Sequence, residues 1–253
     1  MKAICVIPAR MASSRYPGKP LKKLLGLEMI NHIYRRCRAC KSFDEVVVAT
    51  CDEEIAQSIR SENGIAIMTA DTHERCTDRV SEAVSKLPYK LNSDDLVLMV
   101  QGDEILVDPK KLAEMIDLFK ATKPPVINLI SRLYDSADFD DPNTVKVVTN
   151  LDGHALYMSR SCVPSQARST GKAEVYQQTG IIAFQASFLE KFSSLKPTPY
   201  EIAESVDMMR VIEHGLTLRT VKSDVETIGV DTEADLLRAE NIMRNDPVTQ
   251  SYL

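Results

Sequence analysis

Short apolar runs alternate with helical patterns through the first hundred residues of the chain. The apolar runs cover residues 3–9, 45–50, 65–70 and 95–103, and the helical patterns between them cover residues 29–41, 53–62 and 78–87. Runs that are apolar throughout indicate strands buried on both faces, and their alternation with helices is typical of a parallel sheet with right-handed crossovers. The pattern therefore predicts a doubly wound α/β fold, in which ligands bind beyond the carboxyl ends of the strands.

The pattern in the second half of the chain is less regular. It predicts further strands at residues 124–133, 144–150, 153–160, 179–185 and 216–224. We expect a helix from Tyr200 to His214, ended by Gly215, and a closing helix over residues 232–245 with Thr232 as its N-cap. Because no internal repeat or low-complexity linker divides the sequence, we predict one domain over residues 1–253 with a smaller mixed α/β lobe.

Composition and charge exclude several classes of protein. The 253 residues carry a formal net charge of −5, which argues against nucleic-acid or membrane-surface binding, since both need a broad positive field. The sequence has neither a cationic N-terminal stretch leading into an apolar run nor an apolar run of membrane-spanning length. We therefore expect a cytoplasmic protein that neither binds nucleic acid nor inserts into a membrane.

Six cysteines are scattered along the sequence. Cys37 and Cys40 have the spacing of a CxxC motif, but no second pair accompanies them and they fall within a predicted helix. A single motif of this kind is weak support for zinc or redox chemistry, and a chain of this length does not need disulfides to build a core. We interpret the cysteines as reduced side chains.

The segment IPARMASSRYPGKP, residues 7–20, carries the first candidate chemistry. Arg10, Arg15 and Lys19 follow the first predicted strand and are separated mainly by small residues and prolines. Such a loop before a helix suits a triphosphate, because backbone N–H groups approach the anion while the cations neutralise it. The loop matches neither GxxxxGK[ST] nor GxGxxG. From spacing alone, a solvated surface loop is an equal alternative.

Seven sequence blocks resemble one family in order along nearly the whole chain. They are IPARMASSRYPGKPL (7–21), VVVAT with Asp52 after it (46–52), MVQGDE (99–104), DPNTVKVV (141–148), ALYMSR (155–160), PTPYE (197–201) and GVDTEADL (229–236). The sequence is most similar to the sugar nucleotidyltransferases that make CMP-KDO, the activated form of 3-deoxy-octulosonic acid (KDO). The resemblance implies a Rossmann-like nucleotidyltransferase fold, a reaction of CTP with a sugar acid, Mg²⁺ as cofactor and a homodimer.

The resemblance also implies roles for individual residues. The anomeric hydroxyl of the acid attacks the α-phosphorus of CTP and pyrophosphate leaves. The implied catalytic residues are Arg10, Arg15, Lys19 and Asp103. The implied nucleotide-binding residues are Pro8, Ala9, Arg10, Ser13, Ser14, Lys19, Arg75, Asp78 and Gln101. Residues 1–125 become the nucleotide-binding half, and residues 126–253 become the acceptor-binding and dimerisation half.

Asp103 and Asp231 match the aspartates that bind Mg²⁺ in the family. Each has a simpler explanation when taken alone, because Asp103 could end a strand in a turn and Asp231 could cap a helix. Occurring together, and in the family context, they favour the metal site. Asp52 is interpreted as a helix cap in preference to a contact of the base, and His73 as a surface residue.

Several positions depart from the family pattern. Arg75 and Cys76 stand where the family usually has serine and glycine, and Arg75 is expected to contact the nucleotide or the acid group of the second substrate. Gln178 stands at a histidine position and Met208 at a glutamine position. Both changes are expected on the acceptor side, for which the resemblance implies the residues Gln178, Tyr157, Glu204 and Arg160. The acceptor is therefore KDO or a related acid such as an amino-deoxy analogue, another ulosonic acid or a phosphonate.

Two other classes of protein compete with the transferase. A dehydrogenase would share the alternating strands and helices, but the glycine-rich first turn that it needs is missing. A non-catalytic module that binds nucleotide sugars is the second alternative. Retention of Asp103, Asp231 and the three cations argues against it, because binding alone does not require the complete set.

Overall fold

The computed structural model describes residues 1–12, 15–168, 173–225 and 227–253. Its main sheet has the strand order β11-β7-β10-β6-β1-β4-β5, with β8 paired to the N-terminal end of β10 and β9 paired to β8. The strands are β1 (Ala3–Ala9), β4 (Glu45–Thr50), β5 (Ile65–Met68), β6 (Leu96–Val100), β7 (Val126–Arg132), β8 (Lys146–Thr149), β9 (Ala155–Ser159), β10 (Tyr176–Gln185) and β11 (Arg219–Ser223). A short hairpin, β2 (Lys23–Leu24) with β3 (Leu27–Glu28), stands apart from this sheet.

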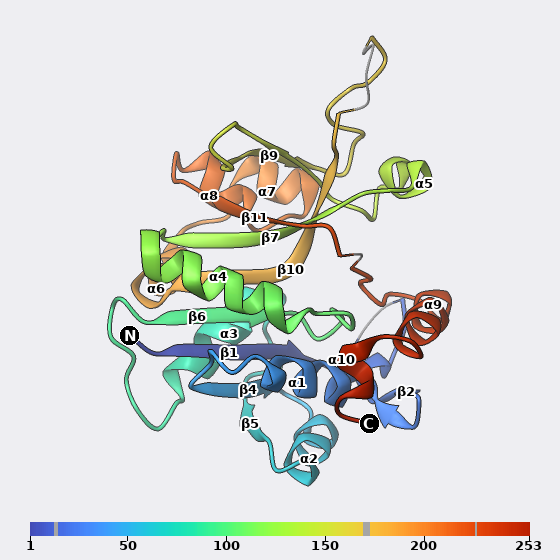
Figure 1. Ribbon diagram of the computed structural model, residues 1–253. Helices are drawn as coiled ribbons and strands as arrows, with labels where there is room; N and C mark the ends of the chain where they lie inside the picture. Colours follow the sequence, from blue (N-terminus) through green and yellow to red (C-terminus); the bar gives the residue numbers. More distant parts are fainter. Residues whose placement is uncertain (13–14, 169–172, 226) are drawn as a thin grey trace.

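The first half of the sheet is parallel, as predicted. Strand β1 pairs in parallel with β4 and β6, and β4 pairs in parallel with β5. Strand β10 is antiparallel to both β6 and β7, and β11 is parallel to β7. The carboxyl ends of β1, β6, β7 and β11 therefore lie along one edge of the sheet (Figure 1). This mixed, mostly parallel sheet confirms the predicted fold class.

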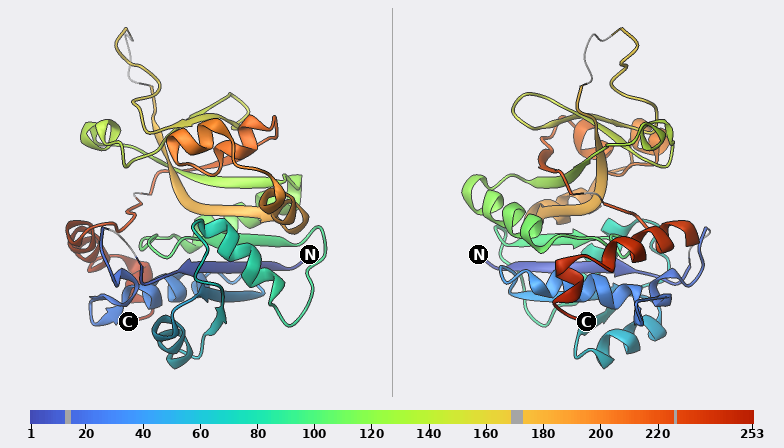
Figure 2. Two further views of the ribbon diagram at one scale, coloured as in Figure 1. Left: turned by 180° about the vertical axis from the view of Figure 1, so that it is seen from behind. Right: turned by 45° about the vertical axis from the view of Figure 1, so that its right-hand side comes forward.

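Helices cover both faces of the sheet (Figures 1 and 2). The helices are α1 (Met29–Ala39), α2 (Glu53–Ser61), α3 (Cys76–Ser85), α4 (Pro109–Thr122), α5 (Ser136–Asp140), α6 (Ala186–Ser194), α7 (Pro199–Glu204), α8 (Met209–Glu213), α9 (Glu233–Met243) and α10 (Pro247–Gln250). Strand β1 alternates between two cores. Cys5 and Ile7 pack into the cluster that contains α1 and α4, whereas Ile4 and Val6 pack into the cluster that contains α3 and α6.

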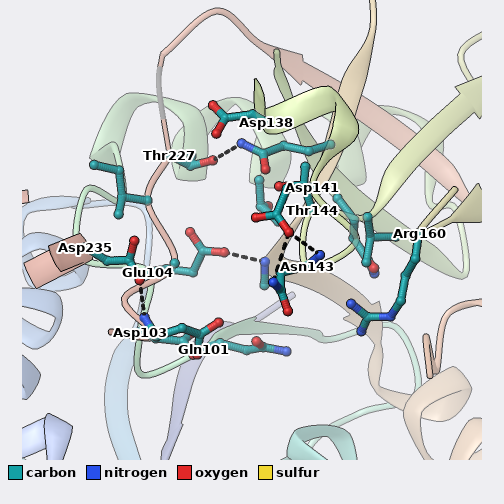
Figure 3. Close-up of a pocket in the computed structure, with 18 of the residues that line it drawn as sticks. Gln101, Asp103, Glu104, Asp138, Asp141, Asn143, Thr144, Arg160, Thr227 and Asp235 are labelled. Carbon is teal, nitrogen blue, oxygen red and sulfur yellow. Dashed lines mark hydrogen bonds between the residues drawn. The ribbon is translucent and has the colours of Figure 1, made fainter. Parts of the chain in front are cut away.

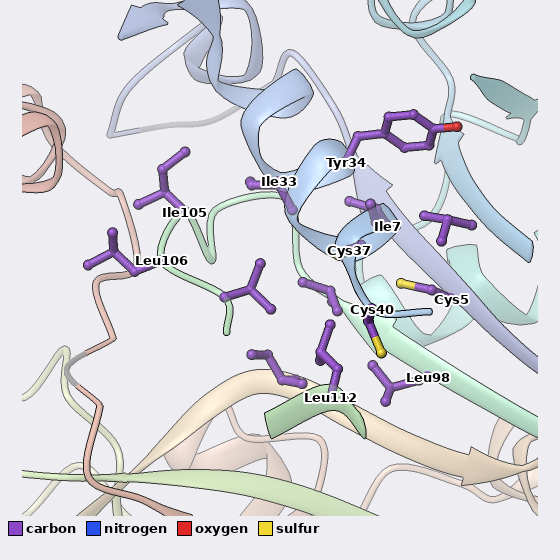
Figure 4. Close-up of a cluster of buried hydrophobic side chains, with 14 of the residues drawn as sticks. Cys5, Ile7, Ile33, Tyr34, Cys37, Cys40, Leu98, Ile105, Leu106 and Leu112 are labelled. Carbon is purple, nitrogen blue, oxygen red and sulfur yellow. The ribbon is translucent and has the colours of Figure 1, made fainter. Parts of the chain in front are cut away.

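The CxxC cysteines belong to the first of these cores. Figure 4 shows Cys37 and Cys40 on α1 and its C-terminal turn, close to Cys5 on β1. All three are buried free thiols, and burial raises the pKa of Cys5. In the described part of the chain no cluster of three or more His, Cys, Asp or Glu residues could hold a metal ion. Their packing agrees with the interpretation as reduced core residues.

The chain returns to its first half at its C-terminal end. Thr232 caps α9 as predicted, in a capping box with Asp235. Beyond α9, Arg36 of α1 donates hydrogen bonds to Asp246 at 2.5 Å and to Thr249 at 3.1 Å. Figure 1 shows α9 and α10 beside the first elements of the chain. None of the helices in the described ranges combines the length and apolar character needed to cross a membrane.

Two helices replace the single helix expected over residues 200–214. Helix α7 ends at Glu204, its C-cap Ser205 has a left-handed backbone (φ 52°), and α8 begins only at Met209. The two helices are joined by an ion pair between Glu201 and Arg210, whose side chains are 1 % and 7 % exposed. Two Arg210 nitrogens donate to the two carboxylate oxygens at 2.5 and 2.7 Å. The sequence prediction was wrong here because the break, residues 205–208, includes the buried Val206 and Met208 and so preserves the apolar spacing of a helix.

Replacing one partner of this ion pair should destabilise the fold, because the other charge remains buried. We expect Arg210→Met to lower the free energy of unfolding by about 3–5 kcal/mol and the double variant Glu201→Leu/Arg210→Met by clearly less. Urea unfolding measures both. Arg60→Met is the control, since the Arg60–Glu53 pair is about half exposed and is worth under ~1 kcal/mol. Equal costs for Arg210→Met and Arg60→Met would contradict the prediction.

Candidate active site

A cavity of about 630 Å³ opens at the edge of the sheet where β1, β6, β7 and β11 end. Its wall includes Arg15 from the loop after β1, Gln101, Asp103 and Glu104 from the end of β6, and Asp231 from the segment before α9. Figure 3 shows Gln101 and Asp103 on one side of this cavity and Asn143, Thr144 and Arg160 on another. Both halves of the chain therefore contribute to one site.

Lys19 joins the two aspartates predicted as metal ligands. Its Nζ lies 2.9 Å from Oδ2 of Asp103 and 3.2 Å from Oδ1 of Asp231, and it donates to the carbonyl of Val230 at 2.7 Å. Burial alone lowers the pKa of Lys19, but the two carboxylates outweigh this effect and raise its pKa above the usual value. The ammonium is therefore charged, and three oxygens from distant segments share it.

Backbone contacts bring the two aspartates together. The N–H of Val230 donates to the carbonyl of Asp103 at 3.1 Å, and Glu104 forms a β-bridge with Gly229. On the other side, Gly18 has a left-handed backbone (φ 72°) that turns the chain into the short 3-10 helix starting at Lys19. Neither aspartate merely ends a strand or caps a helix, since both carboxylates bind Lys19.

The two arginines of the loop have different surroundings. Arg15 forms an ion pair with Oδ2 of Asp231 at 2.9 Å and donates to Asn143 at 3.3 Å, so it spans both halves of the site. Arg10 is exposed, and its guanidinium donates to the carbonyl of His73 at 3.3 Å. Arg15 thus lies at the cavity, whereas Arg10 lies beside the turn before α3. Ser13 and Ser14, predicted to bind nucleotide, lie outside the described residues.

The same loop is held by Asp52. Its Oδ2 accepts the backbone N–H of Met11 at 2.8 Å, and its side chain makes no capping bond to α2 although it occupies the N-cap position. The expected capping role was therefore wrong for the side chain. A carboxylate after β4 instead fixes the start of the cationic loop after the neighbouring strand β1.

Close backbone contacts join Pro8 and Ala9 to Gly102, which is next to Gln101 in the cavity wall. Pro8 and Ala9 are not themselves among the residues of that wall. Pro8 and Ala9 are the last residues of β1, and the N–H of Gly102 donates to the carbonyl of Pro8 at 3.1 Å. A Cβ at Gly102 would come within 2.8 Å of that carbonyl oxygen, and a Cβ at Gly180 within 2.7 Å of the Gln101 side chain. Only glycine leaves room for these contacts.

Glu104 is a buried acid that the sequence reasoning missed. It is 6 % exposed, and its Oε1 accepts the backbone N–H of Gly180. Burial, together with the neighbouring charge of Asp103, raises the pKa of Glu104 to about 7. An Asp-Glu pair shortly after a buried strand was the available signal, because successive side chains of an extended segment point to opposite sides and one of the two can therefore face the interior.

The start of α3 forms another part of the wall. Arg75 lines the cavity, and its Nη1 donates to Ser205 Oγ at 3.4 Å. The next residue, Cys76, also lines the cavity, and burial followed by the charges of Asp103 and Asp207 raises its pKa to about 12. Asp78 lies in the first turn of α3 and is not among the residues of the cavity wall. Its predicted contact with nucleotide stays a prediction.

The predicted acceptor residues separate into two groups. Gln178 and Arg160 line the cavity, whereas Tyr157 and Glu204 do not. Glu204 instead accepts the backbone N–H of Arg160 at 2.8 Å and the hydroxyl of Tyr157 at 3.2 Å. In this structure Glu204 and Tyr157 therefore support Arg160. Met208, expected on the acceptor side, is fully buried in the second core and is not part of the cavity wall.

A buried lysine, also missed from the sequence, supports the same wall. Lys146 has no exposed surface, and its ammonium donates to the carbonyls of Asp141, Thr144 and Arg160 at 2.7 to 2.9 Å. Burial lowers the pKa of Lys146. This residue connects the loop that carries Asn143, the partner of Arg15, to the segment that carries Arg160.

The residues present fit a small divalent cation. Mg²⁺ prefers oxygen ligands and commonly takes one or two carboxylates, with phosphate and water completing its shell. Asp103 and Asp231 both lie within 3.2 Å of one ammonium nitrogen, so their carboxylates can also share one metal ion. Two protein carboxylates leave room for the oxygens of a phosphate-bearing substrate.

Comparisons with known proteins agree with this geometry. The family model described as cytidylyltransferase matches residues 4–224. The 3-deoxy-manno-octulosonate cytidylyltransferase of Geobacter metallireducens is 39 % identical over 93 % of this chain and 95 % of its own length. The protein of the same name from Thermodesulfovibrio yellowstonii is 38 % identical over 96 % of this chain and 98 % of its own length.

Solved structures extend the comparison to the fold. A CMP:2-keto-3-deoxy-manno-octonic acid synthetase complexed with CTP superposes with a TM-score of 0.88 at 36 % identity, over 96 % of this chain and 99 % of that one. A putative glucose-1-phosphate thymidylyltransferase from Bacillus anthracis shares the fold alone, at 17 % identity and a TM-score of 0.70, with 96 % of both chains covered. By sequence and by structure, this chain belongs to the 3-deoxy-manno-octulosonate cytidylyltransferase family.

Proposed function

We propose that this chain transfers CMP from CTP to the anomeric hydroxyl of KDO or a closely related sugar acid and releases pyrophosphate. The observation that carries the proposal is the ammonium of Lys19 between Asp103 and Asp231, two carboxylates that line a cavity together with Arg15. The names of the relatives make KDO the first candidate acceptor. An amino-deoxy analogue, another ulosonic acid or a phosphonate are the alternatives that an assay must separate.

Charge is the main problem of this reaction, because both substrates are anions. Lys19 and Arg15 would bind the triphosphate and stabilise negative charge as pyrophosphate leaves, a role that depends on position and electrostatics. Arg160, which lines another part of the wall, would bind the acid group of the sugar acid. Such an arrangement holds the hydroxyl and the α-phosphorus together and so removes much of the entropic cost of their meeting.

We propose Mg²⁺ as the cofactor, bound by Asp103 and Asp231. A bound Mg²⁺ would lower the pKa of the attacking hydroxyl and neutralise phosphate charge. The support is the hard oxygen donor set and the shared position of the two carboxylates around one cation. The family assignment excludes a dehydrogenase. Excluding a module that binds nucleotide sugars without turnover requires an assay of activity.

The exposed apolar side chains of the second half suggest where a homodimer forms. Leu156, Tyr200 and Ile202 are 54 to 66 % exposed, on β9 and α7, and Tyr200 makes an edge-to-face contact with Tyr157. Large apolar side chains gathered on neighbouring elements are typical of protein interfaces. We propose that this surface joins two copies of the chain, in a protein that acts in the cytoplasm where CTP is available.

Removing the shared cation should abolish most of the activity. We expect Lys19→Ala to lower kcat/KM about 100- to 1,000-fold, the loss measured for other preorganised charge-stabilising groups. Release of pyrophosphate from CTP and KDO measures the effect. Lys23→Ala, at an exposed lysine four residues away, is the control and should retain wild-type activity. Equal activity of the two variants would contradict the proposed role of Lys19.

The metal proposal predicts a specific defect for the aspartates. Asp103→Asn and Asp231→Asn should raise the Mg²⁺ concentration needed for half-maximal activity by at least about 10-fold, because an amide oxygen is a weaker ligand than a carboxylate. The measurement is a Mg²⁺ titration of pyrophosphate release, with exposed Asp117→Asn as the control. Full wild-type activity in the presence of EDTA would overturn the metal proposal.

The dimer proposal predicts that one charge on the apolar surface separates the subunits. Ile202→Asp should convert a dimer into a monomer of about half the mass, because the carboxylate would be buried without a partner in the interface. Light scattering after size-exclusion chromatography measures the mass. Leu237→Asp, at a 57 % exposed residue of α9, is the matched control and should stay dimeric. A monomeric wild type would refute the proposal.

A further inference from the structure

A buried asparagine lies next to the glutamine that replaces histidine in the cavity wall. Asn128 of β7 has no exposed surface, and its Nδ2 lies 3.0 Å from each of three carbonyl oxygens, those of Leu129, Thr179 and Ile181. Carbonyl oxygens only accept hydrogen bonds, so the atom facing them must be the amide nitrogen. The orientation of the Asn128 side chain is therefore fixed.

The orientation of Gln178 follows from that of Asn128. With its nitrogen directed at three carbonyls, Asn128 presents Oδ1, an acceptor, to the Gln178 side chain at 3.0 Å. Only the amide nitrogen of Gln178 can donate to that oxygen. A flipped Gln178 would place its oxygen against the fully buried Oδ1 of Asn128, two acceptors facing each other, and would leave that buried oxygen without a donor. With one N–H of its amide held by Asn128, Gln178 presents its carbonyl oxygen Oε1 to a ligand in a fixed position, beside the second N–H of the amide.

The backbone of β10 supports this arrangement. Strand β10 has an irregular register with β7 between Gln178 and Ile182, so that Thr179 and Ile181 both direct carbonyls at Asn128. Glu104 accepts the N–H of Gly180 within the same irregular segment. The side chain at position 178 is therefore held by a network that includes the end of β6, and Gln178 lines the cavity with Thr144.

We propose that Asn128 is a positioning residue that locks Gln178 as a hydrogen-bond acceptor, so that the site selects a sugar acid through a donor group at this point. The donor is a hydroxyl or an amino group of the acid. A histidine at this position could present either a donor or an acceptor, depending on its tautomer, whereas the locked glutamine always presents Oε1 as an acceptor at the same place. The inference rests on the proposed function, since it specifies how the sugar acid of that reaction is recognised.

The experiment compares acids that differ only in the donor. Wild-type protein is assayed for pyrophosphate release with CTP, Mg²⁺ and either KDO or analogues in which one side-chain hydroxyl at a time is replaced by hydrogen or by an amino group. We expect one position at which hydrogen lowers kcat/KM about 10- to 100-fold, because a buried acceptor is left unpaired. The amino analogue at that position shows whether the hydroxyl or the amine is preferred.

Two variants assign this discrimination to the residue pair. The measured ratio is kcat/KM for the sugar acid that carries the hydroxyl or amino group divided by kcat/KM for the analogue with hydrogen at that position. Gln178→Leu should reduce this ratio to within about threefold of one, with KM for CTP within about twofold of the wild type. Asn128→Ala frees the Gln178 amide to turn and should reduce the same ratio. A ratio measured on one enzyme sample does not depend on how much of that sample is folded, so a purely structural loss would leave it unchanged.

The control lies on the same strand. Gln185, at the far end of β10, donates its amide to Asp94 at 3.0 Å outside the cavity, and Gln185→Leu should keep the wild-type ratio. A wild-type ratio in Gln178→Leu would overturn the inference while leaving the transferase intact. No pyrophosphate release by the wild type with any acid of the panel would overturn the proposed function itself, and this inference with it.

Discussion

One buried ammonium group organises the site. Lys19 is 9 % exposed and satisfies its charge with Asp103, from the end of β6, and with Asp231 and the carbonyl of Val230, from the segment before α9. Two carboxylates at such close range repel each other unless a cation lies between them. The convergence of the loop after β1, the end of β6 and the segment before α9 therefore compensates the buried charge of Lys19 and the repulsion between the two carboxylates at once.

The topology of the sheet makes this convergence possible. Parallel strands place their carboxyl ends at one edge, so the loop after β1 and the end of β6 are neighbours in any fold with this pairing. Inserting the antiparallel strand β10 between β6 and β7 leaves β7 and β11 running in the same direction as β6. The second half of the molecule therefore opens onto the same edge, and one cavity serves both substrates of the proposed reaction.

The sequence predicted features that depend on residue type and order, and missed those that depend on burial. Apolar runs predicted the parallel half of the sheet, and Lys19, Asp103 and Asp231 were named from their motifs. Lys146 and Glu104 stood inside quoted motifs, but a lysine or glutamate is solvated in most proteins, so the sequence could not show that both are buried. Helix α4 was missed although Asp108 and Pro109 begin it with a typical cap and first residue.

Departures from a family pattern differ in meaning according to where each side chain lies. Met208 replaces a polar residue but packs inside the second core, where its effect is on volume and stability. Gln178 also replaces a polar residue, yet it borders the cavity and is bound to a buried asparagine whose own orientation is fixed. Substitutions that are equally unusual in sequence therefore carry unequal functional weight, and the surrounding hydrogen bonds decide which one can change what the site accepts.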